Sequence, residues 1–199
     1  MLRAGNAALQ IRNDILKHWE GLLREWTLCF EQFCLFSETM PALSKREATN
    51  VEILAGAAWR IGLVAFQEMS RKKAGLGGYG YNDLYICSAG HNVSDYIECK
   101  GGWVQDVATA NHLLATACQD ATALDTEDTY SIKVGVAFCN FFCPDIDEAH
   151  INNNIDKLLE AMRAIPSDAM AWCFPQGRRT YRDDLKTIPG VVLLARVVN

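Results

Sequence analysis

The sequence predicts an α/β fold in which helices flank a β-sheet. Segments whose apolar residues recur at three- and four-residue steps, the period of a helix, alternate with shorter segments rich in aromatic and β-branched residues. The strongest strand segment, residues 130–142, is apolar on both faces, which is typical of a central strand that is covered on both sides. This order of segments favours one sheet packed between helices.

The bulk composition is that of one ordinary globular domain. The chain has 199 residues, of which 50% are hydrophobic and 22% are charged, and this length is sufficient to bury a core. The formal net charge of −5 argues against a general polyanion-binding surface but leaves room for a local basic groove. The sequence shows no signal peptide and no apolar run of about 18 residues, so we expect a cytoplasmic protein.

The chain has eight cysteines, and none of them forms the Cys-x-x-Cys motif of many metal sites. Most lie within apolar segments, where a free thiol behaves as a small hydrophobic side chain. We therefore expect reduced cysteines in the core, with disulfides as the alternative.

Residues 1–37 are expected to form one long amphipathic helix. The helix would belong to an N-terminal helical extension of residues 1–45 that packs on a domain formed by residues 46–199. An aromatic stripe of this kind is more often buried in a core than exposed at an interface, so a homodimer through the N-terminal helix is the second expectation. The apolar residues of the stripe are Leu9, Ile15, Trp19, Leu22, Leu23, Trp26, Phe30 and Phe33.

A second helix is expected over residues 46–72. Its apolar stripe continues to Glu68, which places a carboxylate on the buried side of the helix. An unpaired buried charge is very costly, so Glu68 would need a partner. The alternative is that Glu68 lies at the helix end, where it reaches solvent or pairs with Arg71 or Lys72.

The segment 71–80 is basic and rich in glycine. It lacks the Gly-Lys-Ser/Thr motif of a phosphate-binding loop and does not lead from a strand into a helix. We interpret it as a loop whose cations, Arg71 and Lys72 among them, would meet phosphates. A solvated linker is the alternative.

Two short strands, residues 81–87 and 96–102, are expected to form a hairpin. Folding this hairpin about residue 91 brings Asp83 opposite Glu98 or Cys99. Opposed residues of an antiparallel pair lie about 5 Å apart, so these side chains would be close together. Glu98 and Lys100 share a face, since strand side chains repeat every two residues. Two carboxylates this close require a cation or a proton between them, and either Lys100 or a divalent metal would serve. A solvated ion-pair cluster is the alternative.

The remaining elements are expected to be a helix over residues 103–123, a strand, a helix over 146–164 and two last strands. Gln105, at the start of the first of these helices, would be able to reach a substrate or a catalytic group. The last two strands are residues 169–174 and 191–198. Between them lies a basic cluster of Arg178, Arg179 and Arg182, for which a solvated face is the alternative.

This order of elements and charges resembles the PD-(D/E)xK nuclease superfamily, and within it small bacterial members. Asp83 matches the signature aspartate, although Asn82 rather than proline precedes it, and Glu98 and Lys100 match the Glu-x-Lys pair. The resemblance covers about residues 50–175 and implies a restriction-endonuclease-like fold, a three-layer mixed sheet flanked by helices. It also implies that Glu68 is the carboxylate of the preceding helix and that Gln105 stands where some branches carry a glutamine.

The activity that this resemblance implies is metal-dependent hydrolysis of phosphodiester bonds in DNA or RNA. Asp83, Glu98 and Glu68 would hold Mg²⁺ or Mn²⁺, and Lys100 would orient or help to deprotonate the attacking water. One alternative is a catalytically inactive nuclease fold that serves in binding or assembly. Another is a thiol-based enzyme that uses Cys99. The residues expected to contact phosphates are Arg71, Lys72, Arg178, Arg179 and Arg182.

Overall fold

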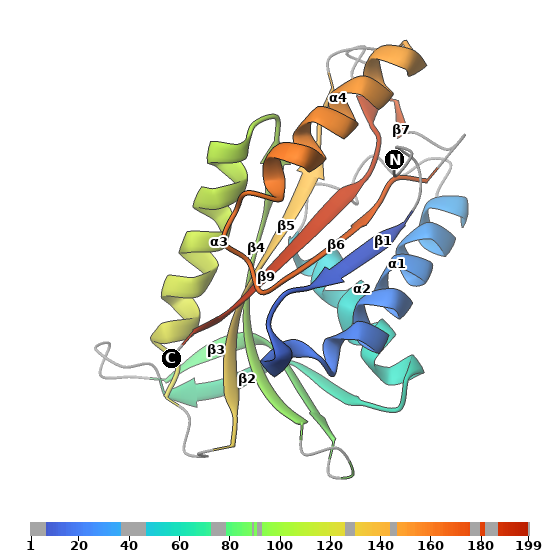
Figure 1. Cartoon of the computed structure of the whole chain (residues 1–199). Helices are drawn as coiled ribbons and strands as arrows, with labels where there is room; N and C mark the ends of the chain where they lie inside the picture. Colours follow the sequence, from blue (N-terminus) through green and yellow to red (C-terminus); the bar gives the residue numbers. More distant parts are fainter. Residues whose placement is uncertain are drawn as a thin grey trace.

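The computed structural model shows a seven-stranded β-sheet with helices on both faces (Figure 1). The structure describes residues 7–36, 47–72, 79–88, 90, 93–125, 130–143, 147–175, 180–181 and 187–198. The expectation of an α/β fold with a sheet flanked by helices is therefore confirmed.

The sheet is mixed, as expected. Its central strands β4 and β5 run parallel, and its other neighbouring pairs are antiparallel. A second, two-stranded sheet is formed by β7 (Thr180–Tyr181) and β8 (Thr187–Ile188). In spatial order, the strands of the large sheet are β1 (Ala8–Ile11), β6 (Ala169–Cys173), β9 (Val191–Val198), β5 (Ile132–Phe141), β4 (Val93–Val104), β3 (Tyr79–Ser88) and β2 (Val64–Lys72).

Two helices cover each face of the sheet. Helices α1 (Trp19–Phe36) and α2 (Glu47–Arg60) share one core cluster with one face, and α3 (Val107–Thr122) and α4 (Glu148–Met162) share another with the opposite face. Alternate residues of each central strand enter alternate clusters, because successive strand side chains point to opposite faces. This double burial explains why the central strands are apolar throughout.

Helix α3 packs very closely on β5, and Gly135 permits this. A Cβ atom at position 135 would lie 2.5 Å from the backbone nitrogen of Cys118 and 2.7 Å from its Cα. Only glycine fits between a strand and a helix at that distance. The position of α3 relative to β5 therefore depends on this glycine.

The expected single helix over residues 1–37 is wrong in its first part. Residues 8–11 form the edge strand β1, which pairs with β6, and the side chain of Asn13 caps the short 3-10 helix η1 (Asp14–Leu16). The aromatic stripe of α1 is buried, with Trp19 and Trp26 at 0% exposure in the core shared with α2. A homodimer through this helix stays a prediction, and these buried residues would not form its contact.

The expected helix 46–72 is wrong beyond Arg60. Gly62 follows with a φ of 83°, and the amide of Leu63 donates a hydrogen bond to the carbonyl oxygen of Ala58 (3.0 Å). This is the glycine-based helix end known as the Schellman motif. The chain then reverses into β2. The apolar residues at the start of β2 happen to continue the helical period of α2, but they belong to a strand.

The expected helix over 103–123 begins too early. Strand β4 continues to Val104, and Asp106 caps α3 by accepting a hydrogen bond from the amide of Thr109 (2.7 Å). The expected strands and the helix from residue 130 onward agree with β5, α4, β6 and β9 to within about two residues at each end. All eight cysteines are free thiols.

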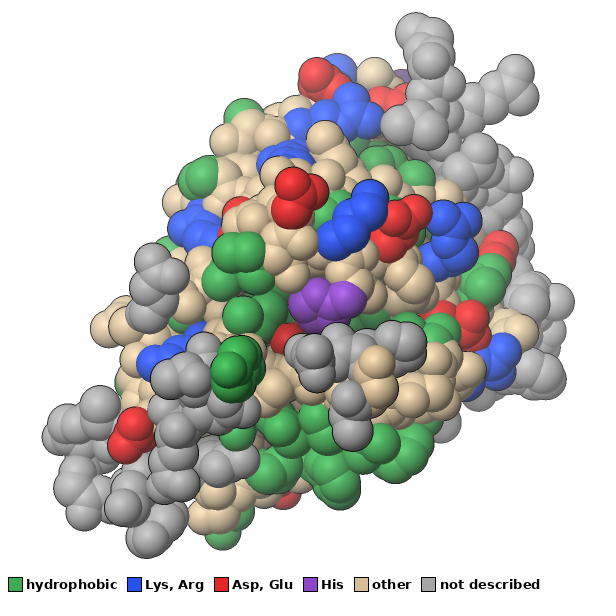
Figure 2. Space-filling view, turned by 60° about the horizontal axis from the view of Figure 1, so that its bottom comes forward, with side chains coloured by type: hydrophobic (Ala, Val, Ile, Leu, Met, Phe, Trp, Pro, Cys, Tyr) green, Lys and Arg blue, Asp and Glu red, His purple; other side chains and the backbone are tan. Residues whose placement is uncertain are grey.

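The surface carries mixed charge on the face that Figure 2 shows. Acidic and basic side chains are interspersed in the upper half of this view, and hydrophobic side chains gather along its lower edge (Figure 2). Within the described part of the chain, no helix is long and apolar enough to span a membrane. Cytoplasmic localisation stays a prediction.

Candidate active site at a fork in the sheet

Strands β3 and β4 separate partway along their length and leave a fork in the sheet. Their pairing runs from Ser88 and Val93 to Leu84 and Ile97. Beyond that point the earlier residues of β3 remain paired with β2, while residues 98–104 remain paired with β5. One edge of β4 therefore faces a gap, and its backbone amides there need partners other than a strand.

Two carboxylates from different elements supply those partners. The Oδ2 atom of Asp83, on β3, accepts a hydrogen bond from the amide of Cys99 (2.6 Å). The Oε2 atom of Glu47, in the first turn of α2, accepts a hydrogen bond from the amide of Gly101 (2.8 Å). Amides two residues apart point to the same edge of a strand, so both carboxylates lie along the free edge of β4.

Gly101 allows helix α2 to begin this close to the sheet. A Cβ atom at position 101 would lie 3.0 Å from the Cα atom of Glu47, which is closer than nearly all real contacts of this kind. The helix start and the strand are thus in backbone contact. The fork is closed on this side by Glu47.

Glu98 and Lys100 project from the same face of β4, as the sequence predicts. Glu98 is 2% exposed and lies beside Gly135 of β5 in the strand register. The Nζ atom of Lys100 lies 2.7 Å from an Oδ2 atom of Asp120 on α3, and this ion pair is partly exposed. The last turn of α3 therefore contributes a third carboxylate beside those of Glu47 and Asp83.

The electrostatics show that these groups act on one another. Burial raises the pKa of Glu47, and the charges of Asp83 and Asp120 raise it further against the hydrogen bond from Gly101 and the charge of Lys100. Burial lowers the pKa of Lys100, but the hydrogen bond to Asp120 and the surrounding carboxylates outweigh this, so the pKa lies above its usual value. The fork is therefore an acidic site in which the side chain of Lys100 keeps its positive charge.

Cys99 lies beneath this cluster and is not a nucleophile. Its side chain is 0% exposed in the core shared with α1 and α2. Burial raises the pKa of the thiol well above its usual range, and the charges of Asp83, Glu47 and Glu98 raise it further. A thiolate does not form there at neutral pH, so the structure contradicts a thiol enzyme based on Cys99.

Glu68 is not on a helix, and this part of the expectation is wrong. It lies on β2 between the pairs Gln67–Leu84 and Met69–Asn82, which places it opposite Asp83, and its side chain is exposed. Its φ of 52° is left-handed, a conformation that is unusual for a residue other than glycine.

The carboxylate that a helix brings to the cluster is Glu47, which sequence reasoning missed. The available signal was its place in the first helical turn, where a carboxylate is favoured by the helix dipole. The assignment to Glu68 followed from extending the helix past Gly62 and into the next strand.

Gln105 is not brought to the cluster. It is exposed in the turn between β4 and α3, five residues beyond Lys100. Together with Asp106, Phe141 and Asn154 it lines a cleft of about 540 Å³ beside α4. A catalytic role for Gln105 at the fork therefore has no geometric support.

The predicted phosphate contacts lie where the structure describes little. Arg71 and Lys72 are the last residues of β2, and their backbones pair with Gly80 and Tyr79, but their side chains lie outside the described part of the chain. Arg178, Arg179 and Arg182 lie outside the described residues. Their contact with phosphates stays a prediction.

The donor set at the fork suits a hard divalent cation in its chemistry. Carboxylate oxygens are the ligands that Mg²⁺ and Mn²⁺ prefer, and a cation would relieve the repulsion between Glu47 and Asp83. Next to Asp83, the buried amide of Asn82 is 0% exposed and makes no hydrogen bond in the described part of the chain. Buried polar groups without a hydrogen bond are rare in folded proteins. Among the described residues, no group of three or more acidic, histidine or cysteine side chains is already arranged around a metal position.

Comparisons with models of protein families, with curated proteins and with solved structures found no match for this chain.

Proposed function

We propose that this chain is a metal-dependent nuclease with a restriction-endonuclease-like fold and that its active site is the fork between β3 and β4. The observation that carries the proposal is the pair of carboxylates on the free edge of β4, with Asp83 on the amide of Cys99 and Glu47 on the amide of Gly101. Beside them lies the Glu98–x–Lys100 pair on the adjoining face.

The order of elements supports the same proposal. Helix α2, strands β2, β3 and β4, helix α3 and strand β5 follow one another with the carboxylates on the first helix, the second strand and the third strand. The superfamily resemblance implies the same order of a helix carboxylate, a strand with Asp83 and a strand with Glu98 and Lys100, and β2 is an additional strand between the helix and Asp83. Glu47 takes the role first assigned to Glu68.

In this proposal Glu47, Asp83 and Glu98 hold Mg²⁺ or Mn²⁺. When bound, the cation supplies a water of lowered pKa and offsets charge on the scissile phosphate. Glu47 and Asp83 each direct one oxygen to a backbone amide, which fixes their orientation before a substrate arrives.

Lys100 would provide the ammonium that acts on the reacting groups. Its raised pKa keeps it charged at neutral pH, so it would orient the attacking water and stabilise negative charge on the phosphate rather than act as a free base. Asp120 holds the ammonium at 2.7 Å and thereby positions it.

Two measurements test the proposal. A thermal melt with and without millimolar Mn²⁺ should show stabilisation of the wild type that is lost in Asp83→Ala. Lys100→Ala should abolish cleavage of nucleic acid while leaving the melting temperature of the apo protein within a few degrees. Lys157→Ala, which removes an exposed lysine of α4, is the matched control and should cleave normally. Unchanged cleavage by Lys100→Ala would exclude this active site.

The second candidate function is a catalytically inactive module for binding or assembly. The ion pair of Lys100 with Asp120 favours it, because this contact already satisfies the lysine in the absence of substrate. An inactive module would show no Mn²⁺ stabilisation, and Lys100→Ala would change the melting temperature alone.

A further inference from the structure

The fork opens onto a face of the sheet that carries a row of aromatic side chains. Phe66 of β2, Tyr85 of β3 and Tyr96 of β4 are successive partners in the strand register, so their side chains project from one face. Tyr81 and Asp83 lie four and two residues before Tyr85 and share this face. Asp83 therefore lies between two tyrosines.

This aromatic face is accessible. Phe66 is 47% exposed and Tyr81 is 64% exposed, whereas Tyr96 is 5% exposed and forms the floor of the row. In the described part of the chain, α2 packs on the opposite face of these strands, and α3 packs over β4, β5 and β9. Exposed aromatic side chains that gather on one surface mark an interaction site more often than chance.

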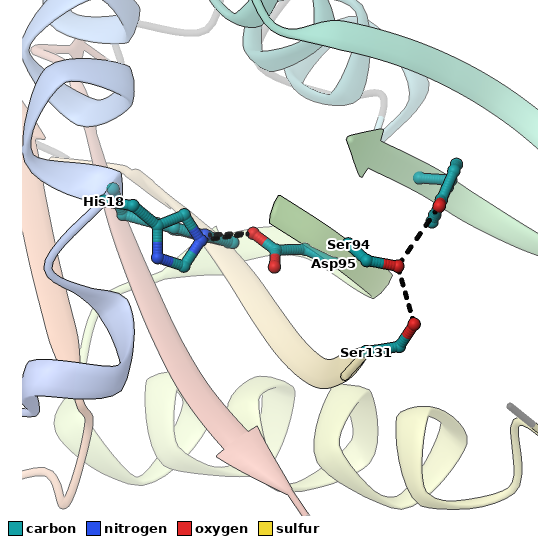
Figure 3. A network of polar contacts seen from close by, with 6 residues as sticks. His18, Ser94, Asp95 and Ser131 are labelled. Carbon is teal, nitrogen blue, oxygen red and sulfur yellow. Dashed lines mark hydrogen bonds and ion pairs between the residues drawn. The ribbon is translucent and has the colours of Figure 1, made fainter. Parts of the chain in front are cut away.

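The ring of Tyr85 is held in place rather than free to rotate. Its centroid lies 4.6 Å from that of Tyr96. Its hydroxyl shares a hydrogen bond with Ser94 (3.2 Å), and Ser94 shares another with Ser131 (2.6 Å). Figure 3 shows the hydrogen bond between Ser94 and Ser131. A ring fixed in this way loses little conformational entropy when a flat partner stacks on it.

A cation extends the row on its other side. Lys133 of β5 is the register partner of Tyr96 and so projects from the same face. The face thus presents rings for stacking, a lysine for a phosphate, and one carboxylate of the fork, Asp83, two residues from Tyr85. At about 3.3 Å per residue, Asp83 lies about 7 Å from Tyr85 along the strand.

We propose that Phe66, Tyr81 and Tyr85 stack against the unpaired bases of a single-stranded nucleic acid while Lys133 binds its backbone. This inference rests on the proposed function and names the substrate class of the same site. Stacking on aromatic side chains needs bases whose flat faces are exposed, and a duplex buries those faces. The site therefore selects single strands over duplexes.

The first test is binding of fluorescently labelled 12-nucleotide single strands, as DNA and as RNA, with the matching 12-base-pair duplex as competitor. The protein carries Lys100→Ala and Mn²⁺ is present, so that the strand binds without being cut. In this background, Phe66→Leu keeps apolar bulk but removes the ring, and Tyr81→Ser removes the second ring. Phe66→Tyr keeps the ring, and Trp59→Leu removes an aromatic side chain that is 55% exposed on α2.

We expect Phe66→Leu and Tyr81→Ser each to raise the Kd for the single strand about fivefold or more, because stacking contributes strongly per base. Phe66→Tyr and Trp59→Leu should stay within about twofold of the parent. Equal losses in all four variants, no loss in any, or tighter binding of the duplex would overturn the proposal. It would also be overturned if Phe66→Leu altered only self-association, measured by sedimentation.

Cleavage separates this proposal from the proposed function. If the wild type cuts nucleic acid but the ring variants bind and cut normally, the nuclease stands and the stacking surface falls. If single strands bind in a ring-dependent way but no cleavage or Mn²⁺ stabilisation occurs, the stacking surface stands and the nuclease falls.

Discussion

Removing the charge of Glu47 and of Glu68 in separate variants is the sharpest test of where the proposed site lies. Glu47→Gln keeps an oxygen that can accept the hydrogen bond from Gly101 (2.8 Å) and removes the charge. Glu68→Gln removes an exposed charge on β2 and leaves the fork intact. Both variants make the same chemical change, so the comparison tests which of the two carboxylates belongs to the site.

The expected magnitude follows from linkage between metal binding and unfolding. At a Mn²⁺ concentration of about ten times Kd, binding raises the free energy of unfolding by about 1.4 kcal/mol. For a chain of this size that is a rise in melting temperature of about 3–6 °C. Loss of one carboxylate that weakens the metal about tenfold leaves about 0.4 kcal/mol, or about 1 °C.

The apo stability of Glu47→Gln should change little. The uncharged amide makes a weaker hydrogen bond to Gly101 than the carboxylate does, which costs about 1 kcal/mol. Removing the charge also removes the burial penalty and the repulsion from Asp83 that raise the pKa of Glu47. These two effects oppose each other.

The assay is differential scanning calorimetry, which measures the melting temperature of the wild type and of both variants over a series of Mn²⁺ concentrations, with Ca²⁺ as a second cation. We expect the Mn²⁺ shift to fall to about 1 °C in Glu47→Gln and to persist in Glu68→Gln. A shift lost in Glu68→Gln but kept in Glu47→Gln would show that the site does not include the start of α2. A shift kept in both would exclude a metal at Glu47 and Glu68 alike.

Two further predictions concern stability. Burial lowers the pKa of His18, but the hydrogen bond and the charge of Asp95, whose Oδ2 atom lies 2.7 Å from His18 Nε2, outweigh it, so the pKa is raised in the folded protein (Figure 3). The stability that His18 contributes is therefore fully present below about pH 6.5, the pKa in the unfolded chain, and is lost as the pH rises through the folded pKa. Urea unfolding at several pH values should therefore show wild type and His18→Gln converging toward high pH, and a constant difference would contradict this. Gly135→Ala should lower the free energy of unfolding by about 1–3 kcal/mol or more, because the added Cβ atom would meet the backbone of Cys118. Chemical denaturation measures this difference, and a denaturation midpoint equal to that of the wild type would contradict the close packing of α3 on β5.

The sequence predicted the part of the candidate site that lies on strands. Asp83, Glu98 and Lys100 were placed on one hairpin from a period of two and a turn, and these rules depend only on residues near in sequence. The pattern Tyr81–x–Asp83–x–Tyr85 was equally visible, and its aromatic face was missed because exposure depends on which helices cover the sheet.

The sequence could not identify the carboxylate that a helix brings to the fork, because residues 64–68 fit both the end of a longer helix and the start of a strand. Residues 64–68 continue the helical period of α2, and that period alone cannot tell a helix from a strand. Gly62 was the local signal for the helix end, and pairing of β2 with β3 then decided the outcome.

By itself the sequence determined the α/β class, the central strands and the Asp83 and Glu98–x–Lys100 spacing, because each follows from alternation or periodicity within one segment. Only the tertiary structure decided that residues 8–11 join the sheet as a strand, that β3 and β4 part after Leu84 and Ile97, and that Glu47 closes the resulting gap. The physical reason is that backbone amides at a sheet edge donate hydrogen bonds to whichever acceptor the rest of the chain brings to them, and that acceptor lies far away in the sequence.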